Sequence, residues 1–307
     1  MLLDINAENK KAEKKYGILG IEWDQGDVNG RPGAKYAPKS VKQCAERFIG
    51  RIQDNKIFDV ENWRMLDLAN ISVKDFGQLK GLPVYDWMQA YDRIEDTIGT
   101  IIEEGRKPVI IGGDCSLNYV AAKSLHDTLK GKMGVVYMDA HFDTLAEDTW
   151  CGKYSHSSPL RNILNLPNVD ADNVVQLGVR GYVYPKFYEF VEETGYHVIN
   201  NTAFFEMGVE KTAEKILERV TDGTEKVMLC LDIDVLEGIF SPGSSCNESA
   251  GPSARELEAM VKKLAPYVDG ICITEINVMA DLNDITSMEG AKLMWDYIMN
   301  NYGSEKA

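Results

Sequence analysis

The sequence contains no long apolar run. No stretch approaches the roughly 20 consecutive apolar residues that a transmembrane helix requires, so no membrane partner is expected. Residues 1–16 are polar and charged, and they lack the basic start and the apolar segment of a secretory signal. The protein is therefore predicted to be cytoplasmic.

Closely spaced cysteine pairs are also missing. No two of the six cysteines form a CxxC pair, and several lie in apolar segments that resemble strands. This pattern is typical of reduced thiols in a cytosol rather than of a disulfide framework. The six cysteines are Cys44, Cys115, Cys151, Cys230, Cys246 and Cys272.

Positive charge is scarce. The 33 Lys and Arg residues are outnumbered by 48 Asp and Glu residues, which gives a net charge of -15. This charge argues against nucleic acid as a partner, since binding phosphates needs a basic patch. The sequence also has neither GxGxxG nor GxxxxGK[ST], so nucleotide binding is disfavoured. An acidic surface suits a cationic small molecule, although many proteins are acidic for solubility alone.

The 307 residues show no internal repeat, low-complexity tract or linker, so we predict one domain over residues 1–307. Apolar segments alternate with helical patterns, which predicts an α/β protein with a doubly wound parallel sheet. Helices are predicted from about residue 37 and over 85–104, 210–220 and 287–297. Strands are predicted at 17–21, 64–68, 107–111, 134–138, 174–178, 197–199, 226–231 and 270–274.

Acidic and histidine side chains gather where the buried segment 134–138 ends. Asp139, His141 and Asp143 follow that segment directly. Ligands of open α/β sheets bind at the carboxyl ends of the strands. Mixed Asp and His sets hold hard or borderline divalent cations. The alternative for these residues alone is a polar turn with an incidental histidine.

A second carboxylate pair, Asp232 and Asp234, follows the segment 226–231, and Glu275 follows the segment 270–274. Residues at positions i and i+2 of a regular strand point to the same side. Carboxylates brought together without a cation repel one another and raise one another's pKa. Two acidic strand ends in one sheet therefore favour a site for two divalent metals, which could share a water and activate it for hydrolysis.

Two further candidates follow from position. Cys115 lies just after the strand 107–111, in Gly112-Gly113-Asp114-Cys115-Ser116, and His156 lies in the loop that follows Asp143. An isolated loop histidine is usually a surface residue, and His156 gains importance from the neighbouring metal cluster.

The motifs resemble those of the arginase/agmatinase/formiminoglutamase (ureohydrolase) family. Residues 112–116 are similar to the family's GGDHS, 139–143 to its DAHxD and 232–242 to its DxDxxDPxxxP. The segment 275–281 is similar to ExxPxxD, and residues 156–161 to HGTPFR. The resemblance covers nearly the whole chain, with the motifs in the family's order.

The resemblance implies a three-layer αβα sandwich with a central eight-stranded parallel sheet, assembled as a homo-trimer or homo-hexamer. It implies two divalent metal ions, usually Mn²⁺, bridged by Asp139 and Asp232. Asp143 and residue 115 would complete one site, and His141 and Asp234 the other. His156 would shuttle protons and Glu275 would hold the guanidinium of a small cationic substrate. The implied activity is hydrolysis of a C–N bond in a linear guanidino or amidine compound by a metal-bridging hydroxide.

The chain departs from the family at two informative positions. Cys115 replaces the histidine of GGDHS, so that metal site is expected to stay partly empty in Mn²⁺ or to take Zn²⁺ or Fe²⁺. Leu145 stands where arginases carry an asparagine that reads the amino-acid head of arginine, which favours agmatine-like guanidines over arginine. The substrate's tail would be read by loops 22–38, 144–161 and 180–186.

Three alternatives to an agmatinase-like enzyme remain open. The chain could be a catalytically silent or regulatory relative with an incomplete metal site. It could hydrolyse an amidine, as formiminoglutamases do. In the third alternative, the Cys115 thiolate attacks the substrate carbon, with His141 or His156 as the base.

Overall fold

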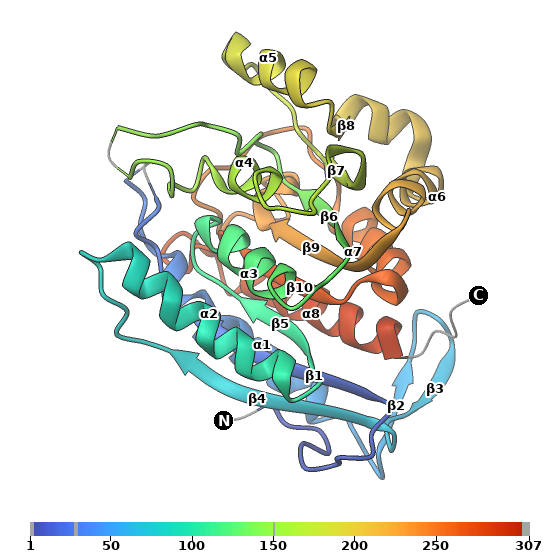
Figure 1. Ribbon diagram of the computed structural model, residues 1–307. Coiled ribbons are helices and arrows are strands. Elements are labelled where there is room, and N and C mark those ends of the chain that lie inside the picture. The colour runs from blue at the N-terminus through green and yellow to red at the C-terminus, as the bar shows by residue number, and fades with distance from the viewer. Residues whose placement is uncertain (1–2, 28–29, 150, 303–307) are drawn as a thin grey trace.

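The computed structural model describes residues 3–27, 30–149 and 151–302. Its centre is an eight-stranded sheet with the order β4-β1-β5-β10-β9-β6-β7-β8, in which every neighbouring pair is parallel. A separate antiparallel pair, β2-β3, lies at one end of the molecule (Figure 1). The eight-stranded parallel sheet was predicted from the family resemblance and is confirmed.

The elements have the following bounds. The strands are β1 (Lys14–Ile21), β2 (Lys56–Asp59), β3 (Arg64–Asp67), β4 (Ile71–Leu79), β5 (Lys107–Ile111), β6 (Lys132–Met138), β7 (Val174–Leu177), β8 (His197–Ile199), β9 (Thr224–Asp232) and β10 (Gly270–Thr274). The helices are α1 (Ala37–Ile49), α2 (Trp87–Glu103), α3 (Ser116–His126), α4 (Pro159–Leu164), α5 (Pro185–Thr194), α6 (Asn201–Val220), α7 (Ala254–Leu264) and α8 (Ile285–Tyr302).

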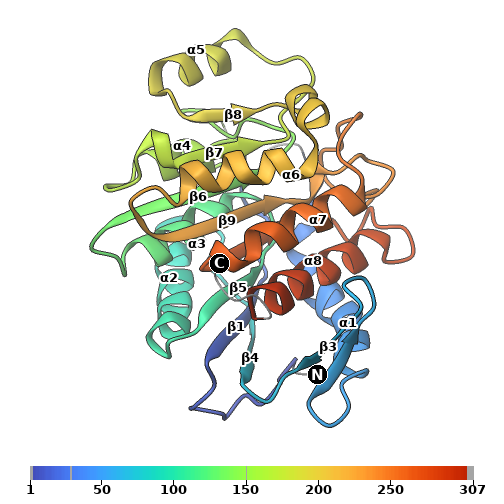
Figure 2. The ribbon, with the colours of Figure 1, turned by 90° about the vertical axis from the view of Figure 1, so that its right-hand side faces the viewer.

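Helices cover both faces of the sheet. The apolar residues of α1, α6, α7 and α8 belong to one buried cluster, and those of α2, α3 and α4 belong to another. Figures 1 and 2 show α2 and α3 on one side of the sheet and α1, α7 and α8 on the other. The three-layer sandwich follows from strands that are apolar on both faces, as parallel strands usually are.

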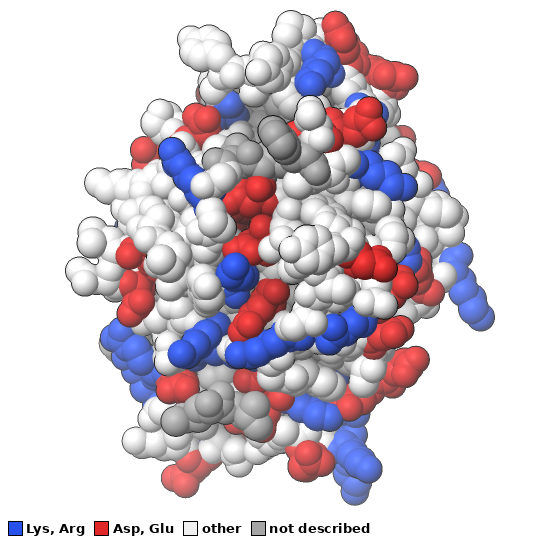
Figure 3. Space-filling model, turned by 90° about the vertical axis from the view of Figure 1, so that its left-hand side faces the viewer, with Lys and Arg blue, Asp and Glu red and all other residues white. Residues whose placement is uncertain are grey.

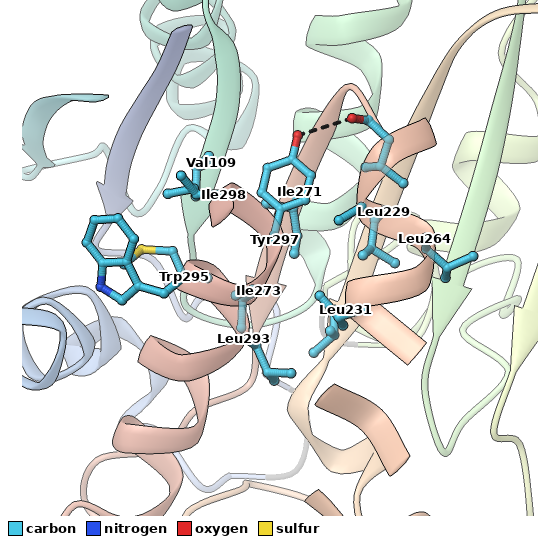
Figure 4. Packing of buried hydrophobic residues seen from close by; sticks show 14 of the residues in the cluster. Val109, Leu229, Leu231, Leu264, Ile271, Ile273, Leu293, Trp295, Tyr297 and Ile298 are labelled. Atoms are coloured by element: carbon cyan, nitrogen blue, oxygen red, sulfur yellow. Dashed lines mark hydrogen bonds between the residues drawn. The ribbon is translucent and has the colours of Figure 1, made fainter. Parts of the chain in front are cut away.

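The core beneath α8 illustrates the packing. Ile271 and Ile273 of β10 and Leu229 of β9 lie against Tyr297 and Ile298 of α8 (Figure 4), and all five side chains are fully buried. Burying one such side chain contributes roughly 1.5–3 kcal/mol. This packing fixes the ends of β9 and β10, where acidic side chains emerge.

The predicted elements are correct in part. The segment 64–68 was predicted as a strand of the main sheet, but β3 pairs with β2 in the separate hairpin. The edge strand is β4, which sequence analysis missed because Lys74, Asp75 and Gly77 interrupt its apolar pattern. The helix predicted at 210–220 is the second part of α6, after a kink at Gly208, where φ is 72°. Helices α3, α4, α5 and α7 were not predicted.

The carboxyl ends of the strands point to the left in Figure 1. The residues that follow β5, β10, β9 and β6 carry the predicted site, and these four strands are contiguous in the middle of the sheet. Among the described residues, no helix has the length and apolar character needed to cross a bilayer.

Candidate active site

The predicted site residues surround one cavity of about 180 Å³ at the carboxyl ends of the central strands. Figure 3 views this face and shows acidic side chains recessed in its middle. Asp139 has no exposed surface and does not line the cavity, but it lies next to His141, which does. The remaining predicted residues all line it: Cys115, His141, Asp143, His156, Asp232, Asp234 and Glu275.

The turn after β6 places three candidates. Asp139 Oδ1 accepts a hydrogen bond from the backbone N–H of His141 at 2.6 Å. Asp143 has φ 54°, a left-handed conformation that a non-glycine residue adopts at a cost of about 1–3 kcal/mol. Its backbone oxygen accepts hydrogen bonds from Leu160 and Arg161 at the start of α4, which hold the turn in place.

The end of β9 faces this turn. Asp234 Oδ2 lies 3.0 Å from His141 Nδ1, and Asp139 Oδ1 lies 3.4 Å from the same nitrogen. Asp232 Oδ1 accepts a hydrogen bond from the Asp234 N–H at 2.8 Å. Ligand atoms of Asp139, His141 and Asp234 all lie within 4.8 Å of one another, so these three residues could hold one cation.

The ends of β5 and β10 form the opposite side of the cavity. Glu275 has φ 64°, and its Oε1 accepts a hydrogen bond from the Cys115 N–H at 2.9 Å. His156 Nδ1 lies 3.5 Å from the same oxygen. The Cys115 thiol points toward Asp143 Oδ2 at 3.2 Å and toward the His156 carbonyl oxygen at 2.9 Å.

The buried carboxylates of the cavity create a negative potential that favours a bound cation. Burial, and then the neighbouring carboxylates, raise the pKa values of Asp139 and Asp232 well above the usual range. Burial also opposes ionisation of Asp234, but His141 outweighs it, so the pKa of Asp234 is lowered. Asp139 Oδ2 is buried without a hydrogen-bond partner in the described structure. A bound divalent cation would pair with this oxygen and offset the repulsion, so the residues fit a metal centre.

The histidines also respond to these carboxylates. Burial opposes the charged form of His156, but the hydrogen bond and charge of Glu275 raise its pKa to about 9. Burial raises the pKa of the Cys115 thiol well above its usual range, and the charge of Asp143 adds to the effect. Because a thiolate is the reactive form, this environment argues against Cys115 as a nucleophile.

Sequence analysis missed four residues of the site. Tyr137, on β6 itself, donates a hydrogen bond to Asp143 Oδ2 at 2.7 Å. Cys246 Sγ lies 3.5 Å from His141 Nε2. Phe142 and Phe187 both line the cavity and stack with centroids 5.7 Å apart. Cys246 lies in an irregular loop. The only signal in the sequence that could have indicated its role in the site is that this loop follows Asp234.

The loops expected to read the substrate's tail are described in part. Residues 28–29 and 150, within the loops 22–38 and 144–161, lie outside the described residues. Ser157 and Val183, from the second and third of these loops, line the cavity.

A family model described as "Arginase family" matches residues 14–299. The chain belongs to the arginase family. The family predicted from the motifs is thereby confirmed, and membership implies a binuclear divalent metal site, which the buried carboxylates described above fit.

Individual proteins similar to this chain support the family assignment. A guanidinopropionase of Pseudomonas aeruginosa is 28% identical over 94% of this chain and 86% of its own length. An agmatinase of Bacillus subtilis is 25% identical over 91% of this chain and 93% of its own length. The crystal structure of formimidoylglutamase from Bacillus subtilis superposes with a TM-score of 0.82 at 23% identity, covering 94% of this chain and 87% of that one. The last comparison bears on the fold alone.

The comparisons confirm the predicted class of enzyme but not a particular substrate. The protein is a metal-dependent hydrolase of C–N bonds in linear guanidino or amidino compounds. The named relatives differ in substrate, so the substrate itself is a separate question.

Proposed function

We propose that this arginase-family protein hydrolyses a small cationic guanidino compound of the agmatine type and releases urea. The observation that carries the proposal is the set of buried carboxylates Asp139, Asp232 and Asp234 with the half-buried His141, gathered with Glu275 around one small cavity. The carboxylates suit cations, and Leu145 leaves no side-chain amide for an amino-acid head.

Each residue has a proposed role. Asp139 and Asp232 would hold two divalent ions jointly, with His141 and Asp234 completing the ligands of one ion and Asp143 contributing to the other. Two such ions, when bound, would supply an activated water for attack on the guanidino carbon. Manganese is the proposed metal, and the position beside Cys115 is expected to be the weaker one for Mn²⁺.

Glu275 and His156 serve the substrate. Glu275 Oε2 is buried without a hydrogen-bond partner in the part of the chain described, so it can accept from a guanidinium N–H. His156, with a pKa raised to about 9 by Glu275, is protonated at neutral pH and can deliver a proton to the leaving amine.

Three expectations about domain organisation, assembly and location remain proposals. We expect residues 1–307 to form one domain, the protein to assemble as a homo-trimer or homo-hexamer, and its location to be cytoplasmic.

The second candidate function is that of a catalytically silent or regulatory relative, because Cys115 supplies a thiol where the family has an imidazole.

The deciding experiment measures urea and ammonia release from a panel of guanidino and formimino compounds, with the protein loaded with Mn²⁺, Zn²⁺, Fe²⁺ or Ni²⁺. Urea from an agmatine-like guanidine supports the proposal. No product from any compound, at a measured occupancy of two ions per chain, would favour the silent relative.

Glu275→Gln tests the guanidinium site. A neutral amide cannot form the charge-assisted pair, so kcat/KM should fall by about 10-fold or more, corresponding to the loss of roughly 1.5–3 kcal/mol. Steady-state kinetics against the best substrate provide the measurement. Unchanged kinetics would mean that Glu275 does not contact the substrate.

A further inference from the structure

The described residues contain a second group of potential metal ligands, separate from Asp139, His141 and Asp234. The Cys115 sulfur, a ring nitrogen of His156 and a carboxylate oxygen of Glu275 lie within 4.8 Å of one another, and all three residues are buried. They come from three segments that meet at the ends of β5 and β10 and in the loop before α4. In the proposed function, two of them serve the substrate instead.

The ligand types indicate which ion would bind there. One thiolate, one imidazole and one carboxylate form a zinc-type set, with bond lengths of about 2.0–2.3 Å. Ligand atoms in such a tetrahedron stand roughly 3.5 Å apart. From separations of up to 4.8 Å, the ligand atoms would need to approach one another by about 1.3 Å at most, and rotation about side-chain bonds can provide that.

Glu275 supplies an independent indication of a missing ligand. Its side chain has a relative exposure of only 4%, and Oε2 has no hydrogen-bond partner in the described structure. The other oxygen, Oε1, accepts from the Cys115 N–H, so the carboxylate is held next to the thiol. Leaving a buried carboxylate oxygen unpaired costs roughly 1–3 kcal/mol, which a bound cation would recover.

The surroundings favour a cation and offer a fourth ligand. Asp143 Oδ2 lies 3.2 Å from Cys115 Sγ, within reach of an ion bound by that sulfur. With Asp143 as the fourth ligand, the set of four would be complete, and without it a water could take that position, since these residues line a cavity. No Lys or Arg lines this cavity among the described residues.

We propose that Cys115, His156 and Glu275 form a soft-metal site of zinc type, and that an ion bound there excludes the guanidinium substrate. Binding of the ion releases two protons to solvent, one from the Cys115 thiol and one from the His156 imidazolium. A metal–sulfur bond and a metal–nitrogen bond form, with no change of oxidation state. The exclusion rests on the proposed function, because it follows from the ion's use of Glu275. The metal site itself does not depend on that function.

The test uses metal-free, full-length protein titrated with Co²⁺ and with Cd²⁺, whose thiolate complexes have charge-transfer absorption. The protein should show this absorption, and Cys115→Ser should abolish it. His156→Asn and Glu275→Gln should each weaken Cd²⁺ binding by about 10-fold or more, as losing even a supporting contact costs about 10–100-fold.

Two other cysteines provide matched controls. Cys151 is half-buried and donates to the Gln25 carbonyl oxygen, and Cys246 lies beside His141 on the other side of the cavity. Cys151→Ser and Cys246→Ser should both keep the absorption. The proposed site is refuted if the absorption survives in Cys115→Ser or disappears in Cys246→Ser. It is also refuted if neither His156→Asn nor Glu275→Gln changes Cd²⁺ binding.

Competition tests the exclusion separately. Guanidinium ion at low millimolar concentration should weaken Cd²⁺ binding in the unmodified protein and should have no such effect in Glu275→Gln. Equal Cd²⁺ affinity with and without guanidinium would overturn the exclusion. Failure of the proposed function would instead be seen as no product from the substrate panel, whatever the Cd²⁺ titration shows.

Discussion

Asp232 is a fully buried carboxylate whose charge is opposed by its neighbours. Burial and the charges of Asp234 and Asp139 raise its pKa, so in metal-free protein this group destabilises the fold. In the proposed function, the same group is a ligand when metal is bound. Stability and metal affinity should therefore respond in opposite directions to its removal.

Asp232→Asn should increase the stability of metal-free protein by about 1 kcal/mol, since replacing buried charge is often neutral or stabilising. Metal analysis should show loss of bound Mn²⁺, and added Mn²⁺ should no longer raise the Tm. Asp172→Asn, at an exposed carboxylate, is the control. If Asp232→Asn still gains Tm from Mn²⁺ as the parent does, Asp232 is not a bridging ligand.

Cys115→His restores the family's imidazole at the end of β5. Because imidazole suits Mn²⁺ better than a thiol does, Mn²⁺ should bind the weaker position about 10-fold more tightly. Isothermal titration of metal-free protein measures both sites. Two sites of equal Mn²⁺ affinity in the unmodified protein would show that the Cys115 thiol does not weaken Mn²⁺ binding.

At the level of single residues, the sequence predicted which acidic and histidine side chains the structure brings together, but not the residues that support them. Asp139, His141 and Asp232 were found because acidic residues directly follow apolar strands. Tyr137 was missed because it lies within a strand and reads as core. Cys246 was missed because its loop has no periodicity, so only three-dimensional contact reveals it.

At the level of elements, the turn after β5 depends on a close backbone approach. A Cβ atom at Gly113 would lie 1.4 Å from the Trp23 carbonyl oxygen, which follows β1. The Asp114 N–H donates to that oxygen at 3.1 Å, and the Gly113 oxygen accepts from the Glu275 N–H at 2.8 Å. Gly113 thus joins the ends of β1, β5 and β10.

Gly113→Ala should destabilise the protein by about 3 kcal/mol or more, because backbone would have to move to admit the methyl group. Gly99→Ala is the control, since Gly99 lies within α2 with open space around it, and should stabilise by about 0.5–1 kcal/mol. Denaturant unfolding measures both. A Gly113→Ala protein as stable as its parent would contradict the close contact.

The elements that sequence analysis predicted are those whose pattern is local. Buried segments such as Lys107–Ile111 and Gly270–Thr274 were located because parallel central strands are apolar throughout. Strand β4 was missed because an edge strand tolerates polar residues. Helix α3 was missed because it is buried nearly all round, so it lacks the amphipathic signal.

At the level of the whole molecule, one buried carboxyl group makes stability depend on pH. Burial, and then the charge of Glu258, raise the pKa of Glu289 in α8 from its ordinary 4.5 to about 7. The folded state therefore holds this proton more tightly than the unfolded state. Its contribution to stability is full below pH 4.5 and is lost as the pH rises to about 7.

Glu289→Gln should remove this dependence. At pH 8 the variant should be more stable than the parent by about 3 kcal/mol, since 2.5 pKa units correspond to that energy, and near pH 4.5 the two should be similar. Urea unfolding at both pH values provides the measurement. A part of the slope will remain, because burial also raises the pKa of Asp296 to about 6, that of Asp114 to about 7, and those of Asp139 and Asp232 well above their usual range. A difference that is the same at both pH values would refute the assignment.

The strand order also determines which part of the molecule opens last. The four strands that end at the active site, β5, β10, β9 and β6, are shielded by β4 and β1 on one side and by β7 and β8 on the other. Local unfolding begins where few neighbours hold a segment, so the outer strands fray first. A transient loss of β8 or β4 leaves the strand ends that carry the proposed metal ligands in register. The active site can therefore survive partial unfolding that already exposes the molecule's edges to proteases.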